Sequence, residues 1–229
     1  RTTSGDWRVA KDFSGLPGWI VKSVGGSSQH WAGASLRFQD HEWKAKSTYG
    51  DVDGASLLDW PIDGAEMAPW YAMAEDKLGV TQTNGRPALP GNNNYKVFEK
   101  GAKALEYEKV HTGNMAIASD DNQARTMCQQ TGFCFQGCKW GAKWSAGYND
   151  IPEGEATGNL EVRPQSHVAR ILHNDKGLVT GVEYYDADGT LQTQMASVVC
   201  VAGNSFESPR LLLNSASEMF PNGLANSSD

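Results

Sequence analysis

One segment of this 229-residue chain holds three thiols within eleven residues, as Cys128-x5-Cys134-x3-Cys138. Thiolates spaced this closely suit an iron–sulfur cluster or a zinc ion. The sequence offers no fourth ligand nearby, which counts against zinc. A disulfide plus one free thiol, or thiols simply buried in a loop, would give the same pattern. The spacing therefore leaves a metal role and a structural role open.

A second segment combines glycines and hydroxyls. Gly25-Gly26-Ser27-Ser28 is followed closely by His30-Trp31-Ala32-Gly33. Two adjacent glycines before two hydroxyls predict a tight backbone with exposed N–H groups. Such a backbone can closely approach a phosphate or a flat ring, so we interpret this segment as a candidate cofactor loop.

A third segment lies near the end of the chain. The apolar run 198–202 ends an expected strand over 191–202, and Gly203-Asn204 breaks it. Ser208 and Pro209 predict a helix that begins there, with Ser208 as its N-cap. A strand, a glycine turn and a helix N-terminus together can receive the anionic groups of a cofactor. An ordinary strand–helix crossover has the same pattern.

The elements that position these segments follow from local signals. Asp63 and Glu66 form a capping-box pattern, and Gly79 ends the helix that begins there. From residue 166 the pattern becomes β, with strands expected over 166–172, 178–186 and 191–202. Turns at 174–177 and 186–189 separate these strands. The sequence thus predicts an α/β chain, with Cys200 in the core of its last strand.

Composition excludes several classes of protein. Hydrophobic residues are 39% and charged residues 21%, as in ordinary globular chains. The net charge is −7 and no basic stripe is present, so we expect no nucleic-acid partner. No run approaches the roughly 18–20 apolar residues of a membrane-spanning helix, so we expect no transmembrane segment in this chain.

Two segments together resemble a known family. Residues 25–31 resemble the first signature of the glucose–methanol–choline (GMC) oxidoreductases, flavoproteins that oxidise alcohols and sugars. Residues 203–213 resemble the second signature, with Gly203, a short spacer, Ser-Pro and a leucine run. Trp60-Pro61-Ile62 and the stretch 159–171 resemble further family segments, in the same order. The chain is therefore identified as a member of this family.

The resemblance implies a fold and a domain order. The α/β fold would be part of a glutathione-reductase-like FAD-binding fold with an interleaved α+β substrate region. Residues 1–40 would belong to the FAD-binding part, 41–155 to a substrate or cap region with the cysteines, and 156–229 to the FAD-binding part again. The family's Gly-x-Gly-x-x-Gly motif is expected upstream of Arg1, and its catalytic histidine beyond Asp229. We therefore expect an internal fragment with no catalytic residues of its own, inactive alone.

The implied function is that of an FAD-dependent oxidoreductase acting on CH–OH groups of a sugar, a polyol or a related alcohol. Hydride would pass to flavin N5. The backbone of Val168 would meet the adenine, and Ala202-Gly203 would close the nucleotide site. The implied cofactor-binding residues are Gly25, Gly26, Ser27, Ser28, His30, Trp31, Ala32, Gly33, Val168, Ala202 and Gly203.

The resemblance adds two specific hypotheses. In pyranose oxidases a histidine at the position of His30 is bonded covalently to the flavin, whereas other branches leave it unbonded. Some membrane-linked sugar dehydrogenases carry a three-iron, four-sulfur centre on three cysteines, although their spacing differs from that of Cys128, Cys134 and Cys138. The electron acceptor is unknown, with a cytochrome subunit as one candidate. A periplasmic or membrane-associated location would follow from likeness to those dehydrogenases.

Nearby residues have plainer interpretations. Trp140 and Trp144 either stack on a sugar or pack in the fold. Lys139 and Lys143 are predicted to be solvated charges. Two alternatives to the enzyme also stand: a non-catalytic electron-relay or binding module built on the cysteine segment, and a truncated product without independent function.

Overall fold

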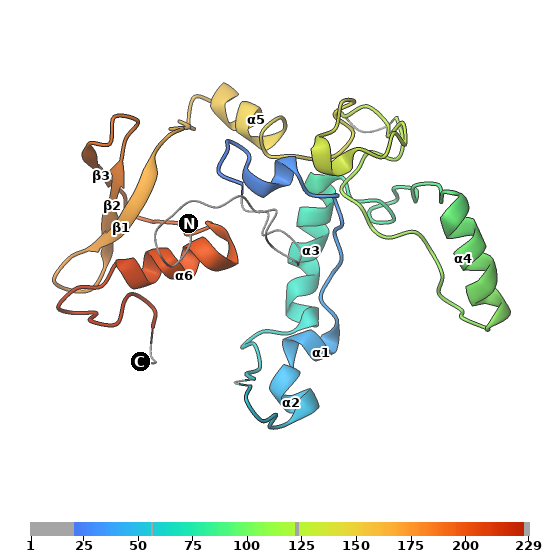
Figure 1. Ribbon diagram of the computed structural model, residues 1–229, viewed down its shortest axis with the longest axis horizontal. Coiled ribbons are helices and arrows are strands. Elements are labelled where there is room, and N and C mark those ends of the chain that lie inside the picture. Colours follow the sequence, from blue (N-terminus) through green and yellow to red (C-terminus); the bar gives the residue numbers. More distant parts are fainter. Residues whose placement is uncertain (1–20, 56, 122–123, 227–229) are drawn as a thin grey trace, which may run out of the picture. The chain divides into compact units, whose positions relative to one another are not determined.

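The computed structural model describes residues 21–55, 57–121 and 124–226, and it divides into two compact units. One unit ends at Leu160 and the other begins at Glu161. The first contains a 3-10 turn η2 (Gly26–Gln29), helices α1 (Asp40–Trp43), α2 (Ala45–Tyr49), α3 (Gly64–Leu78) and α4 (Asn93–Ala104), the 3-10 turn η3 (Cys134–Gln136) and α5 (Asp150–Ala156). The second contains β1 (His167–His173), β2 (Val179–Tyr185), β3 (Leu191–Met195) and α6 (Asn204–Asn214) (Figure 1). Helices and a small antiparallel sheet agree with the predicted α/β class at this level.

Helix α3 begins and ends where its sequence predicts. The Asp63 carboxylate accepts a hydrogen bond from the Glu66 N–H at 2.9 Å, which satisfies a donor that the first turn cannot pair. Gly79 follows the last turn with φ +64°, a left-handed conformation that costs glycine little.

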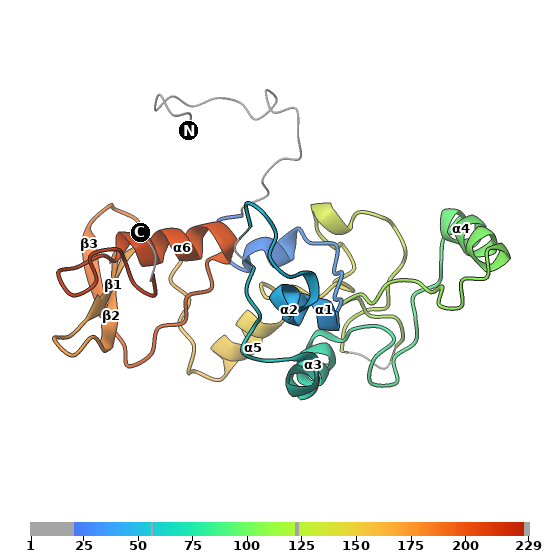
Figure 2. The same ribbon diagram turned by 90° about the horizontal axis from the view of Figure 1, so that it is seen from below.

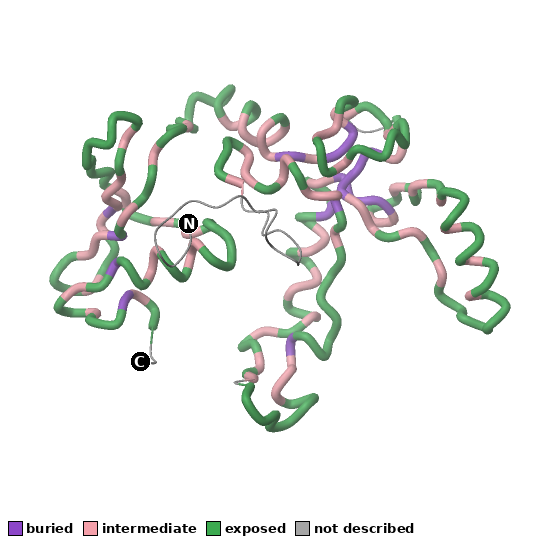
Figure 3. The backbone as a smooth tube through the Cα atoms, viewed as in Figure 1, coloured by how far each residue is buried: buried purple, intermediate pink, exposed green. Residues whose placement is uncertain are grey.

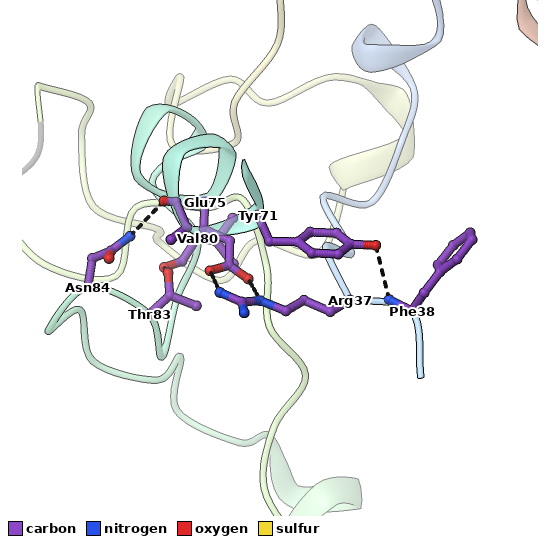
Figure 4. Close-up of polar contacts among 8 residues, drawn as sticks. Arg37, Phe38, Tyr71, Glu75, Val80, Thr83 and Asn84 are labelled. Carbon is purple, nitrogen blue, oxygen red and sulfur yellow. Dashed lines mark hydrogen bonds and ion pairs between the residues drawn. The ribbon is translucent and has the colours of Figure 1, made fainter. Parts of the chain in front are cut away.

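A buried carboxylate joins α3 to the chain that follows the glycine–hydroxyl loop (Figure 4). Glu75 is 5% exposed and accepts two hydrogen bonds from Arg37, at 2.7 and 2.6 Å. The Arg37 guanidinium also lies 5.4 Å from the centre of the Tyr71 ring, and the Tyr71 hydroxyl accepts from the Phe38 N–H. These contacts hold residues 37–38 along one side of the helix.

The core of the first unit is a short extended segment, residues 115–118 (Figure 3). Ala116, Ile117 and Ala118 are all less than 5% exposed. The segment bonds on one side to the chain after the loop, where the Ala116 N–H donates to the Gly33 carbonyl at 2.6 Å. On its other side the Ala118 N–H donates to Ala142 and the Trp144 N–H donates to Ala116, both at 2.8 Å. The chain after the loop and residues 142–144, which are far apart in the sequence, therefore meet at this segment.

The second unit is a hairpin sheet in the order β1-β2-β3, with every neighbouring pair antiparallel. The predicted turns are formed by Asn174 and Asp186, whose side chains accept hydrogen bonds from backbone N–H groups two and four residues on. Helix α6 packs against β1, and the Ile171 N–H donates to the Ser215 hydroxyl at 2.9 Å (Figure 2). Among the described residues, no helix has the length and apolar character needed to cross a membrane.

Three expectations for this unit are wrong. The third strand ends at Met195 rather than continuing to Ala202, and Cys200 is exposed rather than in the core. The apolar run 198–202 has strand propensity, but a strand also needs a hydrogen-bonded neighbour, and these residues are in no strand. Helix α6 begins at Asn204, four residues before Ser208, with Gly203 as its N-cap. In its first turn the N–H groups of Phe206 and Glu207 donate to the Asn204 side chain, which satisfies donors that the helix cannot pair.

Candidate cofactor-binding site

The glycine–hydroxyl loop folds as the tight backbone that its composition predicts. Gly25 and Gly26 have φ of +88° and +55°, and η2 follows Gly25. A Cβ added at Gly25 would lie 2.6 Å from the Gln29 side chain and 2.9 Å from the Gly147 nitrogen. A Cβ added at Gly26 would meet no atom of the described residues within 4 Å. Packing therefore requires the first glycine, while the second leaves one face of the backbone open.

The loop rests on residues 143–147, which we call the support segment. The Ser28 hydroxyl donates to the Gly25 carbonyl and accepts from the Ala146 N–H at 3.1 Å. The Trp31 indole N–H donates to the Trp144 carbonyl at 2.9 Å, and the two indole rings meet edge to face with centres 5.9 Å apart. For Trp144 the packing interpretation is thus the one that the structure shows.

Lys143 is the central residue of this contact, and the prediction that it is solvated is wrong. Its side chain is fully buried, and Nζ lies 3.4, 3.0 and 2.8 Å from the carbonyl oxygens of Ser28, Gln29 and Trp31. Burial lowers the pKa of Lys143, while the nearby thiols Cys134 and Cys138 act in the opposite direction. Lys139 is exposed, as predicted, with its ammonium over the Trp140 ring.

His30 is exposed and bonds to the cysteine segment rather than to the core. Its Nδ1 lies 3.2 Å from the Phe135 carbonyl oxygen. A carbonyl only accepts hydrogen bonds, so Nδ1 carries the proton in this contact and Nε2 of the neutral ring has a free lone pair. Farther along the loop, Ala32 is half-buried, while Gly33 is buried with φ +87°, and a Cβ added to it would lie 3.1 Å from the Ile117 side chain.

The three clustered cysteines are free thiols that line one cavity of about 370 Å³. Burial raises the pKa of Cys134, and the neighbouring Cys128 and Cys138 raise it further. Within residues 21–55, 57–121 and 124–226, no group of three histidine, cysteine, aspartate or glutamate residues is placed to hold a metal ion. The structure thus brings the thiols to a common space without forming a metal site there.

The remaining predicted residues lie in the second unit. Val168 is an exposed residue of β1, paired with Tyr184 of β2. Ala202 and Gly203 are exposed and directly precede α6, the helix that packs against β1. The Gly203 N–H donates to the Ser208 hydroxyl at 3.0 Å. The structure therefore places residues 25–33 and the three clustered cysteines in the first unit, and Val168, Ala202 and Gly203 in the second.

Sequence reasoning missed the support segment. Ser145 is fully buried with its hydroxyl 3.4 Å from that of Ser28, and Lys143 reaches carbonyls 112 to 115 residues away. No local pattern reports a contact over such a separation.

Comparison with known proteins identifies the family. The family model for GMC oxidoreductases matches residues 19–222. The large subunit of fructose dehydrogenase from Gluconobacter japonicus is 29% identical over 223 residues, which cover 92% of this chain and 40% of that protein. A 2-methyl-1,2-propanediol dehydrogenase from Mycolicibacterium austroafricanum is 28% identical, over 91% of this chain and 39% of the relative. The gluconate 2-dehydrogenase flavoprotein from Pantoea cypripedii is 23% identical, over 86% and 38%.

The chain thus spans about 40% of the length of the curated relatives it matches. The family match includes both the glycine–hydroxyl loop and the segment before α6, the two places where the sequence carries family motifs. It covers most of the 229 residues, and the chain therefore belongs to the GMC oxidoreductase family.

Proposed function

We propose that this chain is part of an FAD-dependent oxidoreductase that acts on CH–OH groups of a sugar, a polyol or a related alcohol. Family membership supports this, as do the names of the relatives, which include fructose, gluconate and propanediol dehydrogenases. Because the chain spans about 40% of those relatives, the proposal concerns the complete protein that contains it. A small-molecule alcohol would be its substrate, and a cytochrome subunit is one candidate for the electron acceptor.

The observation that carries the proposal is the family match, which includes the glycine–hydroxyl loop and its open face at Gly26. A flat ring needs a backbone without a side chain at the point of closest approach, and the space beside Gly26 is clear to 4 Å. The two glycines have left-handed backbone conformations. Hydrogen bonds from Lys143 to the Trp31 carbonyl and from the Ala146 N–H to the Ser28 hydroxyl hold the loop against the support segment. These features fit the isoalloxazine of FAD, which would be held by residues 25–33, with Val168, Ala202 and Gly203 on the adenine side.

In this proposal residues 1–40 and 156–229 belong to a glutathione-reductase-like FAD-binding fold, and residues 41–155 to a substrate region. FAD, when bound, supplies the hydride acceptor N5. The loop of this chain would orient the ring, and Trp31 and Trp144, whose indole rings meet edge to face, would support the loop. No described residue is assigned as the base that takes the hydroxyl proton.

A glycine substitution in the complete protein tests the proposal. Gly26→Val should abolish flavin retention, because a branched side chain then fills the open face. Gly54→Val is the matched control, since Gly54 also has a positive φ, +76°, and also has nothing within 4 Å of an added Cβ. Flavin per polypeptide after gel filtration is the measurement. Equal flavin content in the two variants would show that the loop does not touch the cofactor.

Whether His30 bonds the flavin is a separate question within the proposal. A free lone pair on Nε2 suits a nucleophile toward the activated flavin methyl group, and it equally suits an unbonded neighbour of the ring. Acid precipitation of the complete protein separates the two. Yellow colour that stays with the wild-type protein and is released in His30→Ala would establish the bond, and freely extracted flavin would establish the unbonded form.

An iron–sulfur cluster on Cys128, Cys134 and Cys138 is not part of the function proposed for this protein. The shared cavity supports it, but no described trio of ligands is placed to hold a metal ion. Iron analysis and low-temperature paramagnetic resonance of the complete protein provide the test. Iron at background level would leave the three thiols with a structural role in the wall of the cavity.

A further inference from the structure

Lys143 stands out because its ammonium group is buried and none of its hydrogen-bond partners among the described residues is a carboxylate. Its side chain is inaccessible, and the acceptors within reach of Nζ are three backbone carbonyls, those of Ser28, Gln29 and Trp31. Burying an ammonium group is costly unless hydrogen bonds replace its hydration. Three acceptors match the three N–H donors of an ammonium group, so the site is complete in donors and acceptors.

Those carbonyls belong to one feature of the loop. They lie at and just after the C-terminal end of η2, where a helical turn leaves its last carbonyls without intrahelical partners. The Ser27 carbonyl is occupied, since it accepts from the N–H groups of His30 and Trp31. The ammonium group at this end accepts no bond itself but donates to the carbonyls of Ser28, Gln29 and Trp31. These bonds fix the direction in which the chain leaves the turn.

The lysine itself is held on a firm base. Residue 143 forms an isolated bridge with Ile117 in the buried segment 115–118, and the Lys143 carbonyl accepts from the Tyr148 hydroxyl at 2.8 Å. The backbone that carries the ammonium group is thus part of the core of the first unit. Movement of the loop relative to this core would break all three bonds of Nζ together.

We propose that Lys143 is a positioning residue that clamps residues 28–31 onto the core and so presents the open face of the loop to the flavin. The inference rests on the proposed function for its flavin part. The clamp itself rests only on the contacts of Lys143 within the first unit. Lys143 acts through the loop backbone and has no role in proton or hydride transfer.

The test compares three variants of the complete protein. Lys143→Met removes the donors while keeping a long apolar side chain, and Lys143→Arg keeps the charge and donors. Lys139→Met is the matched control, at an exposed lysine four residues earlier in the sequence. Amide hydrogen exchange is measured over residues 26–31 without flavin. Flavin affinity and the visible circular dichroism of the bound flavin are measured separately.

We expect faster exchange at residues 26–31 in Lys143→Met, with unchanged exchange in β1–β3 as the check that the protein is folded. Flavin should bind about 10- to 100-fold more weakly, the loss expected for hydrogen bonds to a charged group. Lys143→Arg should recover part of both effects, and Lys139→Met should match wild type. If Lys143→Met does not fold, Lys143→Gln, which keeps one donor group, makes the same comparison.

Two results would overturn the inference. Unchanged exchange at residues 26–31 in a folded Lys143→Met would show that the loop needs no clamp. Faster exchange with unchanged flavin affinity and dichroism would show that the clamp does not serve the flavin. Failure of the proposed function looks different, because wild type would then bind no flavin while the exchange data still decide whether Lys143 holds the loop.

Discussion

The two units of this protein differ in the contacts that stabilise each of them internally. In the second, each turn is bonded by a side chain from within the turn, as Asn174 and Asp186 show, and successive strands pair directly. In the first, residues 25–33, 115–118 and 142–147 meet although more than 100 positions separate the outer two. The turns of the second unit therefore follow from local sequence, while the first unit depends on a few buried residues that join distant segments.

The largest effect is expected where the second unit has no room. Gly181 of β2 pairs with Met195, and a Cβ added there would lie 2.2 Å from the Gln194 carbonyl oxygen. Backbone cannot give way as a flexible side chain can, so Gly181→Ala should lower the free energy of unfolding of this unit by about 3 kcal/mol. Urea unfolding followed by exchange in β1–β3 is the measurement.

Gly189→Ala is the control for that change. Gly189 sits in the turn between β2 and β3 with φ +75°, and nothing lies within 4 Å of an added Cβ. It should cost only about 1 kcal/mol, the strain of a left-handed residue. Equal losses of unfolding free energy in the two variants would mean that close strand approach at Gly181 is unimportant. Faster amide exchange at residues 26–31 in Gly181→Ala would mean that the stability of the first unit depends on that of the second.

The next effect concerns the first unit. Glu75→Ala removes a buried carboxylate that takes two hydrogen bonds from Arg37. Because the Arg37 side chain remains 43% exposed, part of its charge is solvated, and we expect a loss of about 2 kcal/mol rather than the larger loss of a fully buried pair. The midpoint of urea unfolding measures it.

A surface pair in the second unit calibrates this result. Glu161 binds Arg163 at 2.7 Å, but both side chains are well exposed. Water and salt screen such a pair, so Glu161→Ala should leave the midpoint of urea unfolding nearly unchanged. A Glu75→Ala variant as mild as Glu161→Ala would contradict the view that a few buried groups hold the first unit.

The smallest effect is a pH dependence confined to one turn. The Gln192 side chain and the N–H groups of Thr190 and Asp188 hold the pKa of Asp186 below its ordinary value of 3.8. A folded-state pKa below the unfolded one gives stability that is present at neutral pH and lost as the pH falls through the lowered value. Exchange at Asp188 and Thr190, corrected for intrinsic rates, should rise below about pH 4 in wild type. Asp186→Asn should not show this rise.

The same contrast explains what the sequence can predict. The cap at Asp63, the stop at Gly79 and the turns at 174–177 and 186–189 all follow from local patterns, because each depends on residues up to four positions apart. The loop at 25–28 is recognisable by its glycines and hydroxyls. Its neighbours are not, since nothing around Lys143 in the sequence indicates that carbonyls from residues 28–31 will meet its ammonium group.

The errors in the second unit have a similar cause. Residues 198–202 are apolar enough for a central strand, but strand formation depends on a partner that the local sequence does not specify. The pattern Ser208-Pro209 predicts a good cap for α6 at the wrong position. The helix begins one turn earlier, at Asn204, whose side chain accepts from the Phe206 N–H, and Pro209 lies inside the helix.

The hydrogen bonds of Lys143 are made to backbone carbonyl oxygens, so the conformation of the loop does not depend on the side chains that the loop presents. The three acceptors are the carbonyls of Ser28, Gln29 and Trp31, so the side chain of His30 between them can change without removing an acceptor of the ammonium group. The loop backbone is held at position 143, whereas the exposed imidazole is set separately at position 30. A library that randomises His30 while Lys143 is retained can therefore vary this side chain on a constant backbone.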